Sequence, residues 1–437
     1  MKSVEQYLER YAEAEAKIVQ ASISRFPRRY DNVVTIPLVR EGTAFAPLLR
    51  SLSEASYETP TLGVFIVNGQ EKDRAVNAET MAFLGKWAKE DFCSRMTFGA
   101  YSEYLDLLVV NRATSEKPFL PKEGVGLARK IVGDLALELI EAGVVRKPWI
   151  FCTDGDVAVD SDYFHLPKET GVAAYLAPYR HRCEESVKLA LYDLSLRYYE
   201  MGLRHAGSPY AFQTLGSTLI LRSDCYAMVR GFPKREAGED FYILNKLAKV
   251  GRIVSRRTGQ ISIEDRPSDR VPFGTGAAVG KMDAERFEMY HPASFDLLKV
   301  WLSAAEDYLV APDEEALKDA IGMESFGKVL ESAGVIASLK DAVANRTSTA
   351  AAREEFHRTF DAFRTLKLVH AIRDALLPKL PWEKALLTAE WLPKKNLSEH
   401  GWMIFLIRLL EKEDCEDFSP LVPSAITPFP PLHSGAF

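Results

Sequence analysis

IFCTDGDVAVD, residues Ile150 to Asp160, is the stretch on which the predicted fold depends. Residues 148–153 form a short apolar run, which is typical of a buried strand. This run leads directly into Asp154-Gly155-Asp156. Carboxylate oxygens are the ligands that Mg²⁺ and Mn²⁺ prefer, so the pair predicts a divalent-metal site. The alternative is an ordinary strand-ending Asp-Gly turn with solvated carboxylates.

Outward from this motif, further apolar runs alternate with helical patterns. NVVTIPLV at Asn32–Val39 and LGVFIV at Leu62–Val67 are expected to be buried strands, and the second ends at the turn signal Asn68-Gly69. This alternation predicts an α/β fold with a mostly parallel sheet flanked by helices. In such sheets ligands bind beyond the carboxyl ends of the strands, where Asp154 and Asp156 would lie.

Changes in the pattern of apolar, charged and proline residues along the 437-residue chain predict four parts. Residues 1–31 form a charged amphipathic N-terminal helix, and residues 32–282 form the α/β domain. From residue 283 the strand patterns stop, and FDLLKVWLSAAEDYL is one of several helical patterns that predict a helical C-terminal region over 283–418. Residues 419–437 contain repeated prolines and are expected to form an extended tail.

A second acidic pair lies in GFPKREAGEDF, which starts at Gly231. Glu239 and Asp240 would open a helix, where a carboxylate can remove the proton of an attacking hydroxyl. The alternative is that acidic residues in a first turn only favour the helix dipole. Two weaker candidates follow: Arg266 and Arg270 would clamp phosphate or lie in a solvated basic loop, and His291 would be a third metal ligand or a structural histidine.

The order of the motifs is more specific than any one of them. Strand-Pro-x-x-x-Glu, a strand ending in Asn-Gly, a helix with Ala-Arg-Lys, strand-Asp-x-Asp, and Gly-Phe-Pro with Gly-Glu-Asp-Phe follow one another over about Asn32 to Arg257. This order resembles the family 2 glycosyltransferases of the GT-A fold. The resemblance implies a hexosyltransferase-like enzyme that moves a sugar from a UDP- or GDP-sugar donor to a hydroxyl acceptor, with inversion and with Mn²⁺ or Mg²⁺ held by Asp154 and Asp156.

The resemblance also assigns roles to individual residues. Pro37 and Glu41 would line the pocket for the nucleotide base, and Arg129 would lie near the donor phosphates. Asn68 stands where the family usually has an aspartate that grips the base or ribose, which leaves the identity of the base open. Asp154 would take part in donor binding as well as in metal binding. Asp240, together with Glu239, would form the base-and-acceptor pair.

Composition excludes several other classes of protein. A net charge of −6 gives no basic excess for nucleic acid, and no apolar run is long enough to span a bilayer. Five cysteines without a Cys-x-x-Cys pair indicate reduced thiols, and together with the absence of a signal-peptide pattern they predict a cytoplasmic protein. The expected partners include a further copy of the chain in a homo-oligomer. Gly124-x-Gly126 and Gly274-x-Gly276 lack the third glycine of a dinucleotide fingerprint.

Two rival functions stay open. A nucleotidyltransferase would need a Gly-rich, Arg/Lys-bearing loop after the first strand, and VREGTAFAP has a single glycine. A catalytically silent nucleotide-sugar-binding protein of the same fold would not need Asp154, Asp156, Glu239 and Asp240 all intact. The sugar, the base and the acceptor are not specified by the sequence.

Overall fold

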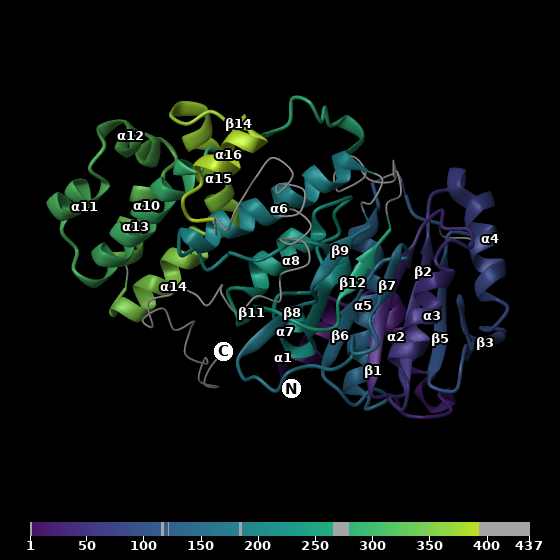
Figure 1. Ribbon diagram of the computed structural model, residues 1–437. Helices are drawn as coiled ribbons and strands as arrows, with labels where there is room; N and C mark the ends of the chain where they lie inside the picture. Colours follow the sequence, from purple (N-terminus) through teal and green to yellow (C-terminus); the bar gives the residue numbers. More distant parts are fainter. Residues whose placement is uncertain are drawn as a thin grey trace. The chain divides into compact units, whose positions relative to one another are not determined.

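The computed structural model describes residues 2–114, 118–120, 122–182, 186–264, 279–344 and 346–392 and divides into two compact units (Figure 1). The first unit comprises Met1–Ser186 and Thr214–Lys281, and the second comprises Val187–Gln213 and Met282–Phe437. The segment Val187–Gln213, in the middle of the region expected to form the α/β domain, thus belongs to the second unit. The proline-containing stretch 419–437 lies outside the described residues.

A nine-stranded sheet forms the centre of the first unit, in the order β11-β8-β10-β6-β1-β2-β5-β4-β3. Seven of these strands run in one direction and only β4 and β10 are reversed, as the pairings show. The predicted α/β class with a mostly parallel sheet is therefore confirmed. The strands are β1 Asn32–Leu38, β2 Thr61–Asn68, β3 Glu90–Cys93, β4 Met96–Ala100, β5 Leu105–Arg112, β6 Trp149–Cys152, β8 Val172–Leu176, β10 Leu219–Arg222 and β11 Arg252–Ser255.

The central strands β1, β2 and β6 are parallel and end at the same edge of the sheet, although β6 ends three residues before β1. Every residue of β2 is buried, as expected for a parallel strand covered on both faces. Leu38 of β1 pairs with Val67 of β2, and Thr35 of β1 pairs with Cys152 of β6. The residues that follow β1, β2 and β6 therefore gather at one edge of the sheet.

Helices cover both faces of this sheet. Leu48, Leu49 and Leu52 of α3 share a core with Val34 and Ile36 of β1, while α5 contacts β1, β2 and β6. A smaller sheet, in the order β7-β12-β9, begins directly after Asp156. These elements are α3 Ala46–Ala55, α4 Arg74–Leu84, α5 Val125–Glu141, α7 Ser223–Met228, α8 Glu239–Leu247, β7 Val157–Val159, β9 Tyr179–His181 and β12 Ile261–Ile263, with 3₁₀ turns at Ile23–Arg25, Glu71–Asp73 and Gly216–Thr218.

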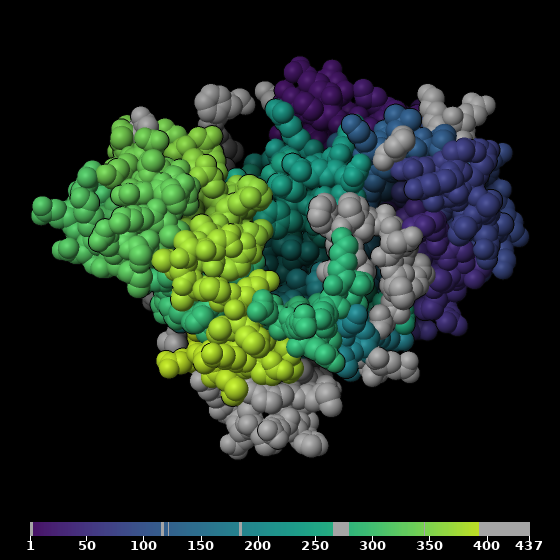
Figure 2. Space-filling model, turned by 90° about the horizontal axis from the view of Figure 1, so that it is seen from above, coloured from purple at the N-terminus to yellow at the C-terminus, as the bar shows by residue number. Residues whose placement is uncertain are grey.

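The N-terminal region forms two helices instead of the single helix that we expected. These are α1, Lys2–Arg10, and α2, Ala14–Gln20. Helix α2 packs on α5 and α1 packs on α7, and Figure 2 shows the purple N-terminal residues against teal residues of the same unit. The break between them lets the segment follow two different helices of the α/β unit.

The second unit is built almost entirely of helices, which confirms the predicted helical C-terminal region. Trp301 of α10 is fully buried in its core, and Leu191, Leu194 and Tyr198 of α6 join the same core. Asp313, Ser348 and Asp361 cap three of the helices with their side chains. The elements are α6 Val187–His205, α10 Ala293–Val310, α11 Glu314–Ile321, α12 Glu324–Ser332, α13 Val335–Ala344, α14 Thr349–Thr359, α15 Ala362–Ala375 and α16 Trp382–Thr388, with the strands β13 Glu288–Met289 and β14 Leu380–Pro381.

Two further expectations concern the environment of the protein. Within the part of the chain that the structure describes, no helix is both long and apolar enough to cross a membrane. The three described cysteines, Cys93, Cys152 and Cys225, carry free thiols.

Candidate functional site

Asp154-Gly155-Asp156 leaves the sheet at the end of β6. The backbone N–H of Thr153 donates to the carbonyl of Thr35 at 3.1 Å, so the chain stays beside β1 until just before Asp154. Gly155 then passes close to the loop after β1: a Cβ there would lie 2.8 Å from Leu38 Cδ2 and 3.2 Å from Glu41 Cδ. Glycine is the residue that fits this close approach, and it brings the buried Glu41 against the acidic motif.

The two aspartates of this motif differ in their surroundings. The side chain of Asp154 is 35% exposed and accepts a hydrogen bond from Arg129. Asp156 is half-buried, and its backbone carbonyl accepts from the N–H of Glu264, which fixes the start of the small sheet at Val157. Both carboxylates therefore lie at the edge where β1, β2 and β6 end.

Arg129, on the first turns of α5, joins the two acidic pairs. Its Nη2 lies 2.7 Å from Asp154 Oδ1 and its Nε lies 3.1 Å from Glu239 Oε1, while its side chain is only 3% exposed. Gly216 leaves the room, because a Cβ there would lie 2.4 Å from Arg129 Nη2. Among the described residues, Arg129 Nη1 is buried without a hydrogen-bond partner. The guanidinium offsets the charges of two carboxylates that are 85 residues apart in sequence.

Glu239 and Asp240 open α8 directly after Gly238, whose φ of 74° is in the left-handed region. The backbone N–H of Phe241 donates to Asp240 Oδ1 at 2.7 Å. Burial, and then the neighbouring charge of Glu239, raise the pKa of Asp240 to about 7. Burial also raises the pKa of Glu239, against the opposing effect of Arg129. A carboxylate with a pKa near 7 is well matched to general-base work at neutral pH.

The residues expected at the nucleotide lie along the same edge of the sheet. Pro37 is the last but one residue of β1, and Asn68 ends the neighbouring strand β2. Asn68 is 5% exposed, and its Oδ1 has no hydrogen-bond partner among the described residues. Its backbone carbonyl accepts from Asn77 Nδ2, and Asn77 Oδ1 accepts from the N–H of Arg40, so the loop after β1 is tied to α4.

Several expected site residues are not brought together by the described structure. Arg266 and Arg270 lie outside the described residues. His291 belongs to the second unit, where its Nδ1 accepts from the N–H of Ala293 and burial lowers its pKa; its role as a metal ligand stays a prediction. Within the described ranges, no group of three or more His, Cys, Asp or Glu side chains is arranged to hold a metal. The role of Asp154 and Asp156 as metal ligands also stays a prediction.

A close backbone contact, which the sequence did not predict, joins the start of α5 to the loop that precedes α8. Gly124 and Gly126, which lack the pattern of a dinucleotide site, lie against the loop before α8. A Cβ on Gly126 would lie 2.5 Å from the carbonyls of Pro233 and Arg235, and the N–H of Gly126 donates to the Arg235 carbonyl. The Gly-x-Gly spacing at a helix start was the available signal for this close backbone approach.

Comparisons with known proteins identify no family for the chain. No protein-family model matches it, and no curated protein does. Among solved structures it is similar to the mannosyltransferase PcManGT from Pyrobaculum calidifontis in complex with GDP-Man and Mn²⁺, with 14% identity, 85% of this chain and 95% of that chain covered, and a TM-score of 0.36. It is also similar to glucosyl-3-phosphoglycerate synthase from Mycobacterium tuberculosis in complex with Mn²⁺, UDP and glucosyl-3-phosphoglycerate, with 11% identity, 70% and 84% covered, and a TM-score of 0.32. At TM-scores this low the likeness carries no conclusion about activity, so the functional interpretation rests on the geometry of the site.

Proposed function

We propose that the protein is a metal-dependent glycosyltransferase that moves a sugar from a UDP- or GDP-sugar to a hydroxyl acceptor with inversion. The observation that carries the proposal is the buried Arg129, which contacts Asp154 of one acidic pair and Glu239 of the other. Through it, carboxylates suited to a cation and carboxylates suited to proton removal lie together at the carboxyl edge of a parallel sheet. That edge is the usual ligand-binding position in folds of this class.

Asp154 and Asp156 would hold Mn²⁺ or Mg²⁺. Their carboxylate oxygens are of the type that such a cation prefers, and both residues are partly exposed, while Asp154 Oδ1 accepts from Arg129. Two protein ligands suffice for an ion that fills its remaining positions with water and phosphate oxygens. When bound, the cation would stabilise the negative charge that develops on the leaving diphosphate.

Asp240 would remove the proton of the attacking acceptor hydroxyl, and Glu239 would help to orient that hydroxyl. The raised pKa of Asp240 supports this role, because a weak carboxylic acid is a stronger base once it is ionised. On the donor side, Asn68 Oδ1, which has no partner in the part of the chain that the structure describes, offers a buried acceptor to an N–H or O–H group of the nucleoside. Pro37 and Glu41 would flank the same nucleoside. Arg129 would lie near the phosphates of the donor.

Calorimetry with UDP- and GDP-sugars, with and without Mn²⁺, tests this function, followed by an assay of donor hydrolysis and transfer. We expect binding that needs the cation, and Asp156→Ala should lower turnover at least about a hundredfold without changing the fold. Asp160→Ala, four residues further on and exposed, is the matched control and should behave as wild type. Full activity in excess EDTA would exclude the metal role.

The same measurements separate the rival functions. A nucleotidyltransferase would release or consume pyrophosphate, whereas a glycosyltransferase releases a nucleoside diphosphate. A silent binding protein would bind the donor and release no product with any acceptor. Release of a nucleoside diphosphate that depends on Asp156 is expected only from the proposed enzyme.

A further inference from the structure

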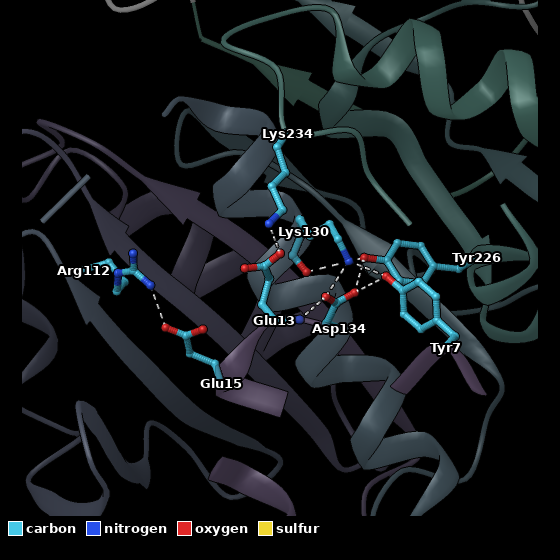
Figure 3. Close-up of polar contacts among 8 residues, drawn as sticks. All are labelled: Tyr7, Glu13, Glu15, Arg112, Lys130, Asp134, Tyr226 and Lys234. Atoms are coloured by element: carbon cyan, nitrogen blue, oxygen red, sulfur yellow. Dashed lines mark hydrogen bonds and ion pairs between the residues drawn. The ribbon is translucent and has the colours of Figure 1, made fainter. Parts of the chain in front are cut away.

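A buried polar network lies along α5 on the C-terminal side of Arg129. Its centre is Asp134, which is fully buried (Figure 3). Asp134 Oδ1 accepts from the hydroxyls of Tyr7 at 2.5 Å and Tyr226 at 2.9 Å, and Oδ2 accepts from Lys130 Nζ at 2.7 Å and from the N–H of Glu13 at 2.8 Å. These donors come from α1, α7, α5 and the residue before α2, so one carboxylate joins four elements.

Such a network is sensitive to the loss of any member. A buried carboxylate is tolerated only when its oxygens are paired and hydrogen-bonded, and here Lys130 supplies the charge while the other three donors complete the set. Burial raises the pKa of Tyr7, so its hydroxyl stays protonated as a donor. The network therefore fixes the N-terminal segment on α5 and α7 in one arrangement.

The same side chains contact the start of the loop that leads to the acidic pair of α8. This loop, residues 231–238, begins at Gly231 with a φ of 64°. A Cβ on Gly231 would lie 2.4 Å from the Tyr7 hydroxyl and 2.8 Å from that of Tyr226, so both tyrosines touch its backbone. Lys234 Nζ in the middle of the loop lies 2.5 Å from Glu13 Oε1.

The N-terminal segment also reaches the donor side of the site. Glu15 is 2% exposed, and its Oε1 lies 2.7 Å from Arg112 Nη1 at the end of β5. Arg112 pairs in the sheet with Asn68, the residue expected at the nucleoside. Glu13 and Glu15 thus hold the loop before α8 and the end of β5 from a single short segment, as Figure 3 shows.

We propose that the N-terminal segment of α1 and α2 positions the acidic pair Glu239–Asp240 for transfer, with Tyr7 and Glu13 as positioning residues that act through the loop 231–238. The proposal rests on the proposed function in that it gives Asp240 a role in proton removal. Neither Tyr7 nor Glu13 would touch substrate. Their effect would be on the placement of the base, and displacement of a reacting group by about 1 Å can cost a factor of about 100 in rate.

The experiment compares Tyr7→Phe and Lys234→Gln with the control Tyr11→Phe. Tyr11 is also on the N-terminal segment but is 40% exposed, and the control removes the same hydroxyl. We expect Tyr7→Phe to lower kcat about tenfold and Lys234→Gln to lower it several-fold, each with an unchanged KM for the donor. The double variant Glu13→Lys with Lys234→Glu restores an ion pair between the same two positions, so it should recover most of the turnover that Lys234→Gln loses. Tyr11→Phe should match wild type.

Hydrogen–deuterium exchange supplies a readout that does not depend on activity. Amides of residues 231–238 should exchange faster in Tyr7→Phe and Lys234→Gln than in wild type or Tyr11→Phe. Lys234 is 55% exposed, so its loss should hardly change the melting temperature, and this variant still decides the matter if Tyr7→Phe fails to fold. Wild-type kcat together with wild-type exchange in Lys234→Gln would overturn the proposal. Faster exchange in a protein that transfers no sugar would support the positioning and reject the function.

Discussion

At the scale of single residues, the site depends on the pairing of Arg129 with two carboxylates. Arg129→Met would leave Glu239 buried and Asp154 partly buried without that charge, and removal of one member of a buried ion pair costs about 3–5 kcal/mol. Arg358→Met, which breaks an exposed pair with Glu355, should cost about 1 kcal/mol or less. Chemical denaturation of both variants and of the wild type measures the two losses in the free energy of unfolding. Equal stabilities would contradict the pairing.

Asp240 should set the pH dependence of transfer. Its pKa is raised to about 7 by burial and Glu239, and Arg129, Asp154 and the N–H of Phe241 also act on it. Because only the ionised form accepts a proton, kcat/KM should rise with pH through about 7. Asp240→Asn should remove this rise and lower transfer at least about a hundredfold, with near-normal melting temperature and donor affinity. Wild-type turnover of Asp240→Asn would leave Asp240 as a helix-start residue and reopen a retaining mechanism.

At the scale of elements, the start of α5 and the loop before α8 must touch backbone to backbone. Gly126→Ala would put a Cβ 2.5 Å from two carbonyl oxygens, so the loop would move and carry Asp240 with it. We expect lower stability and a clear loss of transfer. Gly327→Ala, inside α12 with its nearest neighbour at 4.0 Å, is the control and should be neutral or stabilising by up to about 1 kcal/mol. A fully active and stable Gly126→Ala protein would show that the contact is dispensable.

Elements with a strong local pattern were predictable from sequence, and elements defined by distant partners were not. β1, β2 and β6 are apolar and continuous because both faces of the sheet are covered. We did not predict β3 and β4, which follow β5 at one end of the sheet, or the three-residue strands β7, β9 and β12, since such short runs carry no periodicity. Helix α6 belongs to the helical unit because it contacts α10, which lies about 100 residues further along the chain.

The acidic motifs of the site were predictable for a similar reason. Strand ends and helix starts are local features, and Asp154, Asp156, Glu239 and Asp240 all occupy them. The bridging position of Arg129 was not predictable, because its partner Glu239 is 110 residues away. The network around Asp134 had one signal, a Lys-x-x-x-Asp spacing inside a helix, in which the three residues between Lys130 and Asp134 are apolar or small.

At the scale of the whole molecule, the chain crosses between its two units more than once. It builds β1 to β9 in the first unit, contributes α6 to the second, returns for β10, β11 and α8, and then completes the helical unit. The site therefore takes Arg129 and Asp154 from before this excursion and Glu239 from after it. When the second unit folds, Val187–Gln213 packs with residues that follow Lys281, and this closes a loop, Thr214–Lys281, that carries the second acidic pair.

This interleaving predicts the result of truncation after Lys281. The shortened chain would keep α6 but lose α10 to α16, so Leu191, Leu194 and Tyr198 would lose the core in which they are buried. Exposed apolar surface costs about 25 cal/mol of free energy per Å², so the exposed side chains favour association. We therefore expect aggregates in light scattering and strong binding of a hydrophobic dye. Leu191→Gln, Leu194→Gln and Tyr198→Gln introduced into the truncated chain should restore a monodisperse protein, because they remove the exposed apolar face and leave the α/β unit unchanged. If the simple truncation were monodisperse and fully active, the helical unit would be unnecessary for both folding and transfer. If the glutamine variants still aggregated, the α/β unit itself would need the second unit in order to fold.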